Sequence, residues 1–82
     1  MAATILDLTG LKCPLPALLT GRALRTMSVG EILEVHCTDP MAAIDIPVLV
    51  QQSGDRIDHA ETRDTTLVFV IRKLNAAIAK DD

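Results

Sequence analysis

Cys13 is the side chain in this 82-residue chain with the clearest capacity for chemistry. It stands in the run GLKCPLP, residues 10–16, directly before Pro14. Proline is favoured at the first helical position, so Cys13 should lie at or beside a helix start, where unpaired N–H groups and the helix dipole stabilise a thiolate. Lys12 adds a neighbouring cation, and Pro16 stiffens the first turn. We expect an exposed nucleophile whose pKa lies below that of a free cysteine.

The residues alone leave a second interpretation of Cys13 open, because a single cysteine in a small domain is usually a buried apolar side chain. His36 and His59 fall on other expected strands, where we expect them to be exposed or half-exposed, so neither stands near Cys13 as a general base. A Cys-His hydrolase is therefore poorly supported. Cys37 alternates with apolar residues and is expected in the core, with a role as a resolving thiol as the alternative.

The elements that must position Cys13 follow from the pattern of apolar residues. Residues 31–38 alternate cleanly between the two faces of a strand. Asp39 and Pro40 suit the cap and first turn of a second helix, in which Pro47 should cause a kink or a split. The sequence predicts strands at 4–8, 31–38, 56–61 and 66–73, helices from Pro14 to Thr26 or Met27 and from 39 to 52, a hairpin turn at 62–65 and a tail at 74–82.

The order strand-helix-strand-helix-strand-strand predicts an α/β (α+β) fold, a two-layer sandwich. A strand-helix-strand unit pairs its strands in parallel through a right-handed crossover, and the last two strands form an antiparallel hairpin. The result is one domain, with a core at about residues 4–73, in which both helices cover one face of a mixed four-stranded sheet. Arg63 should lie at the same end as Cys13 as a candidate partner contact, and Arg72 and Lys73 at the opposite end as solubilising charges.

An apolar outer surface is expected on the two helices beside Cys13. At 100° per residue, the sets that should face the core are Ala17, Leu24 and Met27 in the first helix and Ala42, Ile46, Leu49 and Val50 in the second. The outer faces carry apolar side chains that would meet water and serve as a partner-binding surface: Leu15, Leu19, Met41, Ile44 and Val48. The alternative is that a tilted first helix buries Leu15 or Leu19.

The composition excludes several function classes. Aromatic residues make up 1% of the chain and the net charge is -3, so we expect no binding to nucleic acid or to a membrane. No apolar stretch approaches the ~18 residues of a membrane helix, and the first residues do not resemble a signal peptide, so we expect a cytoplasmic protein with reduced thiols. Two cysteines and two histidines at scattered positions form no metal-site pattern. We expect no metal, no cofactor and a monomer.

Three stretches of the chain resemble the TusA/SirA-like sulfur-carrier family, whose signature is Cys-Pro-x-Pro. They are residues 6–16 (LDLTGLKCPLP), residues 38–47 (TDPMAAIDIP) and residues 69–73 (FVIRK), so the resemblance extends over nearly the whole domain. It implies the strand order 1-2-4-3 and assigns the persulfide-bearing position to Cys13. The supporting motif residues are Gly10, Lys12, Pro14 and Pro16, and secondary candidates in the second stretch are Asp39 and Pro40.

The resemblance also implies a function. The family cysteine accepts a sulfane sulfur as a persulfide from a cysteine desulfurase or a rhodanese-like donor. It then passes the sulfur to an acceptor protein in tRNA thiolation, sulfur oxidation or cofactor assembly, as a sulfurtransferase that works without a substrate pocket. Leu15 and Ile44 depart from the tRNA-thiolation members, which carry an acidic and a basic residue there, so the resemblance does not fix the partners. A thiol-based redox regulator and a plain interaction module remain the alternatives.

Overall fold

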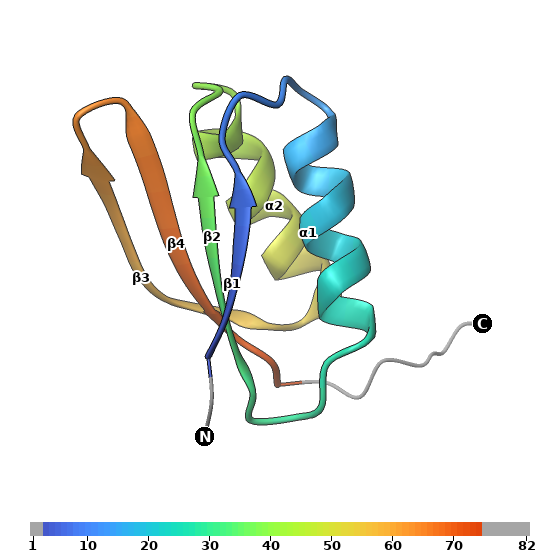
Figure 1. The fold of residues 1–82 in the computed structure, drawn as a ribbon. Helices are drawn as coiled ribbons and strands as arrows, with labels where there is room; N and C mark the ends of the chain where they lie inside the picture. Colours follow the sequence, from blue (N-terminus) through green and yellow to red (C-terminus); the bar gives the residue numbers. More distant parts are fainter. Residues whose placement is uncertain (1–2, 75–82) are drawn as a thin grey trace.

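The structure is a computed structural model that describes residues 3–74 of the chain. Its elements follow one another in the predicted order (Figure 1): β1 (Ala3–Leu8), α1 (Leu15–Arg25), β2 (Ile32–Cys37), α2 (Ala42–Ser53), β3 (Arg56–Arg63) and β4 (Thr66–Arg72). None of the helices within residues 3–74 is both long and apolar enough to cross a bilayer. The predicted tail lies outside the described residues, apart from Leu74.

The four strands form one mixed sheet in the order β1-β2-β4-β3. β1 and β2 pair in parallel, and β4 pairs antiparallel with both β2 and β3, so the predicted topology is confirmed. The register places Leu8, at the end of β1, opposite Cys37, at the end of β2. The chain therefore leaves both strands at the same end of the sheet, where the segments leading to α1 and α2 lie close together (Figure 1).

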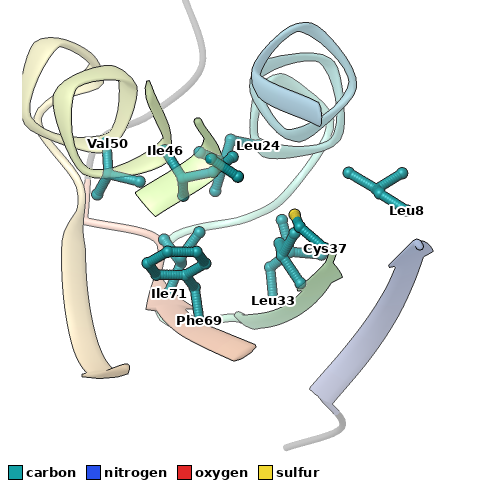
Figure 2. Close-up of a cluster of buried hydrophobic side chains, with 10 residues drawn as sticks. Leu8, Leu24, Leu33, Cys37, Ile46, Val50, Phe69 and Ile71 are labelled. Carbon is teal, nitrogen blue, oxygen red and sulfur yellow. The ribbon is translucent and has the colours of Figure 1, made fainter. Parts of the chain in front are cut away.

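The core lies between the sheet and the two helices, which both cover the same face (Figure 2). β2 contributes Leu33, Val35 and Cys37, each fully buried, as its alternating pattern predicts. α1 contributes Leu24, and α2 contributes Ala42, Ile46 and Val50. Leu49, which was also predicted to face the core, is half-buried and lies outside this cluster. Burial of these apolar side chains is what holds the helices against the sheet.

The two helices differ from the prediction at their beginnings and at Pro47. α1 begins at Leu15, with Pro14 as its N-cap, and α2 begins at Ala42, with Met41 as its N-cap. Asp39 is therefore not the N-cap of α2, although its carboxylate accepts a hydrogen bond from the Met41 N–H at 3.1 Å. Of the two outcomes predicted for Pro47, a kink or a split, the split does not occur, because α2 runs through Pro47 as one helix. Core residues on both sides of the proline hold the helix together despite the missing hydrogen bond.

The end of the sheet opposite Cys13 contains a buried ion pair that the sequence analysis did not anticipate. Lys73 is 3% exposed, and its Nζ lies 3.6 Å from the Asp55 carboxylate, which is itself fully buried. Lys73 is thus not the solubilising surface charge that we predicted. Arg72 also has a partner, because its guanidinium donates to Asp58 at 2.9 Å. Both cations contribute to the structure of this end.

Both ends of the described chain lie at this same end of the sheet. Ala3 pairs with Ile32 at the start of β1 and β2. After β4, the Lys73 backbone pairs with the segment before β2, since its N–H donates to the Glu31 carbonyl at 2.9 Å and its carbonyl accepts the Gly30 N–H at 2.8 Å. The chain therefore enters and leaves the sheet at the end opposite the loop that joins β1 to α1, as Figure 1 shows.

Candidate functional site

Cys13 is exposed, in the short loop that joins β1 to α1. It immediately precedes the N-cap of α1, and the Cys13–Pro14 peptide bond is cis. The first turn is closed by backbone hydrogen bonds from the Leu15 N–H to the Lys12 carbonyl at 2.9 Å and from the Leu18 N–H to the Pro14 carbonyl at 3.1 Å. Pro16, at the second helical position, is buried. The prediction of an exposed thiol beside a helix start is confirmed.

Gly10 fixes the other side of the Cys13 loop. Its φ is +85°, a left-handed conformation that glycine adopts without the steric cost a Cβ would bring. Its N–H donates to the Thr38 hydroxyl at 2.8 Å, which ties the loop to the segment that follows β2. The two loops at this end of the sheet are therefore joined directly.

Asp39 makes a second connection between the two loops. Its carboxylate accepts hydrogen bonds from the backbone N–H of Cys13 and from that of Met41. These two bonds, in that order, and the charge of Lys12 hold the pKa of Asp39 below its ordinary value. The position of Cys13 is thus held by the start of the α2 segment as well as by its own helix. Pro40 is exposed beside this connection.

Asp45 is a residue of the candidate site that the sequence analysis missed. It lies in the first turn of α2, and the Cys13 thiol donates a hydrogen bond to its Oδ2 at 3.1 Å. That hydrogen bond, followed by partial desolvation and by the charges of Asp45 and Asp39, raises the pKa of Cys13. The predicted lowering is therefore wrong. The helix start is present as expected, but two carboxylates from the neighbouring segment oppose it, and Lys12 acts on Asp39.

A sequence signal for Asp45 existed. It is the only charged residue between Asp39 and Asp55. It also falls in the first turn of a helix that was already expected to begin at the same sheet end as Cys13. The sequence does not show that two helices side by side bring this carboxylate within hydrogen-bond distance of the thiol.

Cys37 is fully buried at the end of β2, where it packs in the core cluster (Figure 2). Burial, with a smaller contribution from the charge of Asp39, raises the pKa of its thiol to about 11. Both cysteines are free thiols. The prediction of a core position for Cys37 is confirmed. A buried thiol with a raised pKa is a poor nucleophile.

The two histidines and Arg63 each contact a glutamate. His36 contacts Glu34 and His59 contacts Glu61, each at 2.6 Å. Arg63 lies at the same end of the sheet as Cys13, as expected, and donates a hydrogen bond to Glu61. However, β2 and β4 separate its strand from β1, a distance of about 14 Å at the usual spacing between strands. Within residues 3–74, no group of three acidic, His or Cys side chains could hold a metal ion.

Exposed apolar side chains surround Cys13 on both helices, although not all are the predicted ones. Of the predicted set, Leu15, Met41, Ile44 and Val48 are between 45% and 60% exposed. Leu19 is half-buried against the core, so its predicted exposure is wrong, and Leu18 is 60% exposed in its place. The remaining exposed large apolar side chains lie elsewhere, as with Ile5 on the open face of the sheet.

The error on α1 has a physical cause in its buried face. That face includes Thr20 and Gly21, which the count of apolar residues does not mark as buried. A Cβ at Gly21 would lie 3.3 Å from the Leu49 Cδ1 atom, so glycine lets α1 and α2 approach closely there. This close approach turns Leu19 toward the core and Leu18 toward water.

A shallow groove runs between α1 and α2 next to Cys13. Its volume is about 360 Å³. Its lining is mostly apolar, with Pro14, Ala17 and Leu18 on one side and Asp45, Val48, Leu49 and Gln52 on the other. Among the described residues that line it, Asp45 alone is charged. The carboxylate that holds the thiol therefore also faces a surface that a partner can reach.

Comparison with known proteins shows which sequences and structures this chain resembles. The model of the family described as sulfurtransferase TusA matches residues 4–73. The sulfur carrier protein TusA of Allochromatium vinosum is 35% identical over 68 residues, which are 83% of this chain and 90% of that protein. That of Pseudomonas putida is 35% identical over 69 residues, 84% of this chain and 86% of that protein. Their names support a sulfur-carrier role.

Two further matches extend the comparison. A relative from Aquifex aeolicus is 39% identical over 72 residues, and the match covers 88% of this chain but only 36% of the relative. The crystal structure of a SirA-like protein from Desulfitobacterium hafniense superposes with a TM-score of 0.74 over 90% of this chain and all of that one. The identity to it is 16%, so this likeness bears on the fold, which it confirms.

Proposed function

This chain belongs to the TusA sulfurtransferase family, and from that premise we propose that Cys13 carries a sulfane sulfur, as a persulfide, from a donor protein to an acceptor protein. A sulfur carrier needs both kinds of partner. The family resemblance suggests a cysteine desulfurase or a rhodanese-like protein as the donor. The reaction needs a reduced thiol, which suits the cytoplasm. The working unit is one sulfur-carrier domain that acts as a monomer.

The proposed reaction balances without an oxidant. The Cys13 sulfur attacks the outer sulfur of a persulfide on the donor, the sulfur–sulfur bond of the donor breaks, and the donor cysteine leaves as a thiolate that takes up a proton. Cys13 then holds the outer sulfur as its own persulfide. The acceptor repeats the exchange at Cys13, which returns to the thiol form.

The observation that carries the proposal is the exposure of Cys13 on a loop fixed from both sides. Gly10 and Asp39 tie the loop to the segment after β2, so the thiol is held in place at the surface. A sulfur that must pass between two proteins requires such a position, because both partners have to reach the same atom. Exposed apolar side chains around the thiol provide surface for these contacts.

The direct test is to load the protein with a cysteine desulfurase and cysteine and to measure its intact mass. The expected result is a gain of about 32 Da, one sulfur atom, located on Cys13 by peptide mapping. Cys13→Ser should abolish the gain and leave the fold unchanged, because the side chain is exposed. Cys37→Ser is the matched control. It should load normally, although it should lose about 1–3 kcal/mol of stability because it buries a hydroxyl.

Failure of the wild-type protein to load with desulfurase or rhodanese donors would contradict the proposal and favour a redox regulator or an interaction module.

A further inference from the structure

Asp45 lies between the reactive thiol and the groove on the helix surface. Its Oδ2 accepts the Cys13 thiol hydrogen bond at 3.1 Å, and its side chain lines the groove beside Leu18 and Val48. A group that enters the groove and binds this carboxylate would therefore compete with the thiol for it.

The charged groups that act on Cys13 favour its neutral form. Asp45 on α2 and Asp39 in the segment before α2 both raise the pKa of the thiol, and the Asp45 hydrogen bond has the largest effect. Lys12, on the same loop as Cys13, acts on Asp39 and lowers its pKa. These surroundings favour the protonated form of the thiol. It is a poor nucleophile in that form, since the thiolate is the attacking species.

We propose that Asp45 is a positioning residue that holds Cys13 as a neutral thiol in the free carrier, and that a partner releases it by placing a lysine or arginine side chain against Asp45 in the groove. This proposal rests on the proposed sulfur-carrier function and adds a condition to it. The thiol proton leaves to water, the thiolate attacks the outer sulfur of the donor persulfide, and the leaving thiolate of the donor is protonated in turn.

The chemistry of the groove favours a cationic side chain as the occupant. A carboxylate among apolar neighbours forms strong, charge-assisted hydrogen bonds with ammonium or guanidinium groups. The apolar lining from Ala17, Leu18 and Val48 suits the aliphatic part of a lysine or arginine side chain. A cation bound there would neutralise the negative charge of Asp45 beside Cys13, and this favours the thiolate form of Cys13.

The first test measures how fast iodoacetamide alkylates Cys13 as a function of pH, with peptide mapping to separate it from Cys37. In Asp45→Asn, the midpoint of the profile should move to lower pH. Each unit by which the pKa of Cys13 falls raises the thiolate fraction at pH 7 about tenfold. We therefore expect the alkylation rate at pH 7 to rise roughly 3- to 10-fold. Asp45→Glu keeps the charge and should stay close to the wild type. An unchanged profile in Asp45→Asn would overturn the proposal.

The second test introduces the cation within the chain itself. Val48 lies three residues after Asp45 on the same groove wall, so Val48→Lys places an ammonium group within reach of the carboxylate. Its alkylation profile should shift in the same direction as that of Asp45→Asn. Val48→Met is the neutral control. Ile5→Lys, on the open face of the sheet, adds the same charge at a distance from the thiol. Equal shifts in Val48→Lys and Ile5→Lys would refute a role for the groove.

These measurements test the role of Asp45 independently of the proposed sulfur-carrier function, because alkylation needs no sulfur donor. If the protein loads sulfur but no variant shifts the alkylation profile, it is a sulfur carrier in which Asp45 does not hold Cys13 as the neutral thiol. If the variants shift the alkylation profile but the protein never gains the mass of one sulfur atom, Asp45 does hold Cys13 as the neutral thiol and the protein has a different function.

Discussion

Two thiols lie near one end of the sheet in contrasting surroundings, and their reactivities should differ accordingly. Cys13 is exposed, whereas Cys37 is fully buried and burial raises its pKa to about 11. We expect iodoacetamide at pH 8 to label Cys13 in the folded protein and Cys37 only after denaturation. Peptide mass mapping of the two states checks this. Labelling of Cys37 at a comparable rate before unfolding would show that the end of β2 opens to solvent.

Asp39 predicts a pH dependence of stability. Its two backbone hydrogen bonds, from Cys13 first and Met41 second, lower its pKa in the folded state. A group with a lowered pKa stabilises the fold above its ordinary pKa of 3.8, and this contribution is lost as the pH falls below that value toward the lowered one. Asp39→Asn should therefore be less stable than the wild type at pH 7, with the difference shrinking in acid.

Urea unfolding at several pH values from 3 to 7 measures this difference. Asp64→Asn is the matched control, because it also removes one acidic charge, at a hairpin turn where the φ of +55° suits asparagine. The stability difference between Asp64→Asn and the wild type should not shrink in the same way at acidic pH. A constant difference for Asp39→Asn at every pH would mean that the charge of Asp39 contributes nothing to holding the loops together.

At the residue scale, the sequence was enough to locate an exposed thiol beside a helix start, but not to predict the direction of its pKa shift. Cys13, its exposure and the nearby helix start all follow from local pattern. The direction of its pKa shift depends on a contact with a residue 32 positions away. Local reasoning counted Lys12 and the helix dipole, and it had no means of including a carboxylate that only the packing of two helices brings near.

At the scale of elements, the outer faces of α1 and α2 predict which substitutions the fold tolerates. Leu18 and Ile44 are each 60% exposed, so Leu18→Glu combined with Ile44→Lys should fold normally. If the apolar surface beside Cys13 binds the partners, this variant should exchange sulfur with a donor protein more slowly. Unfolding experiments and loading rates with a desulfurase provide the two measurements.

Leu19→Glu is the matched comparison one position away. Leu19 packs against the core, so a carboxylate there should cost about 2 kcal/mol of stability or more. If Leu19→Glu is as stable as the double variant Leu18→Glu with Ile44→Lys, then α1 is rotated about its axis relative to the structure. Normal sulfur exchange in the stable double variant would exclude this surface as the docking site.

The strands were more predictable than the helices, for a physical reason. β2 alternates strictly between buried and half-buried positions, and a strand with one covered face requires this pattern. The buried face of α1 contains Thr20 and Gly21, where close contact with the other helix matters more than hydrophobicity. In α2, Pro47 suggested a break that packing against the core prevents.

At the scale of the whole molecule, the buried pair of Lys73 and Asp55 predicts a large loss of stability far from the reactive thiol. Lys73→Met removes the ammonium group from beside a fully buried carboxylate and should cost about 3 kcal/mol. Urea unfolding measures the loss. Arg56→Met, which removes one side of an exposed ion pair with Asp58, should cause a far smaller change. The alkylation rate of Cys13 should be the same in both variants, and a change in it would show that the two ends of the sheet are coupled.

The overall topology could be predicted from the order of elements, because parallel pairing and the hairpin follow from general rules of connection. The strand order came from the family resemblance, since pattern alone does not decide where the hairpin attaches. Lys73 shows the limit of reasoning from charge. A lysine after a strand is usually exposed, and here the fold buries it against an aspartate that lies 18 positions earlier in the chain.

The placement of the described chain ends has a practical consequence. Ala3 and Leu74 lie at the end of the sheet remote from Cys13, about 20 Å away along a six-residue strand. A protein immobilised on a bead or a sensor chip through a point close to Ala3 or Leu74 would present its thiol outward. Such a surface would leave the thiol accessible to each partner protein applied in turn.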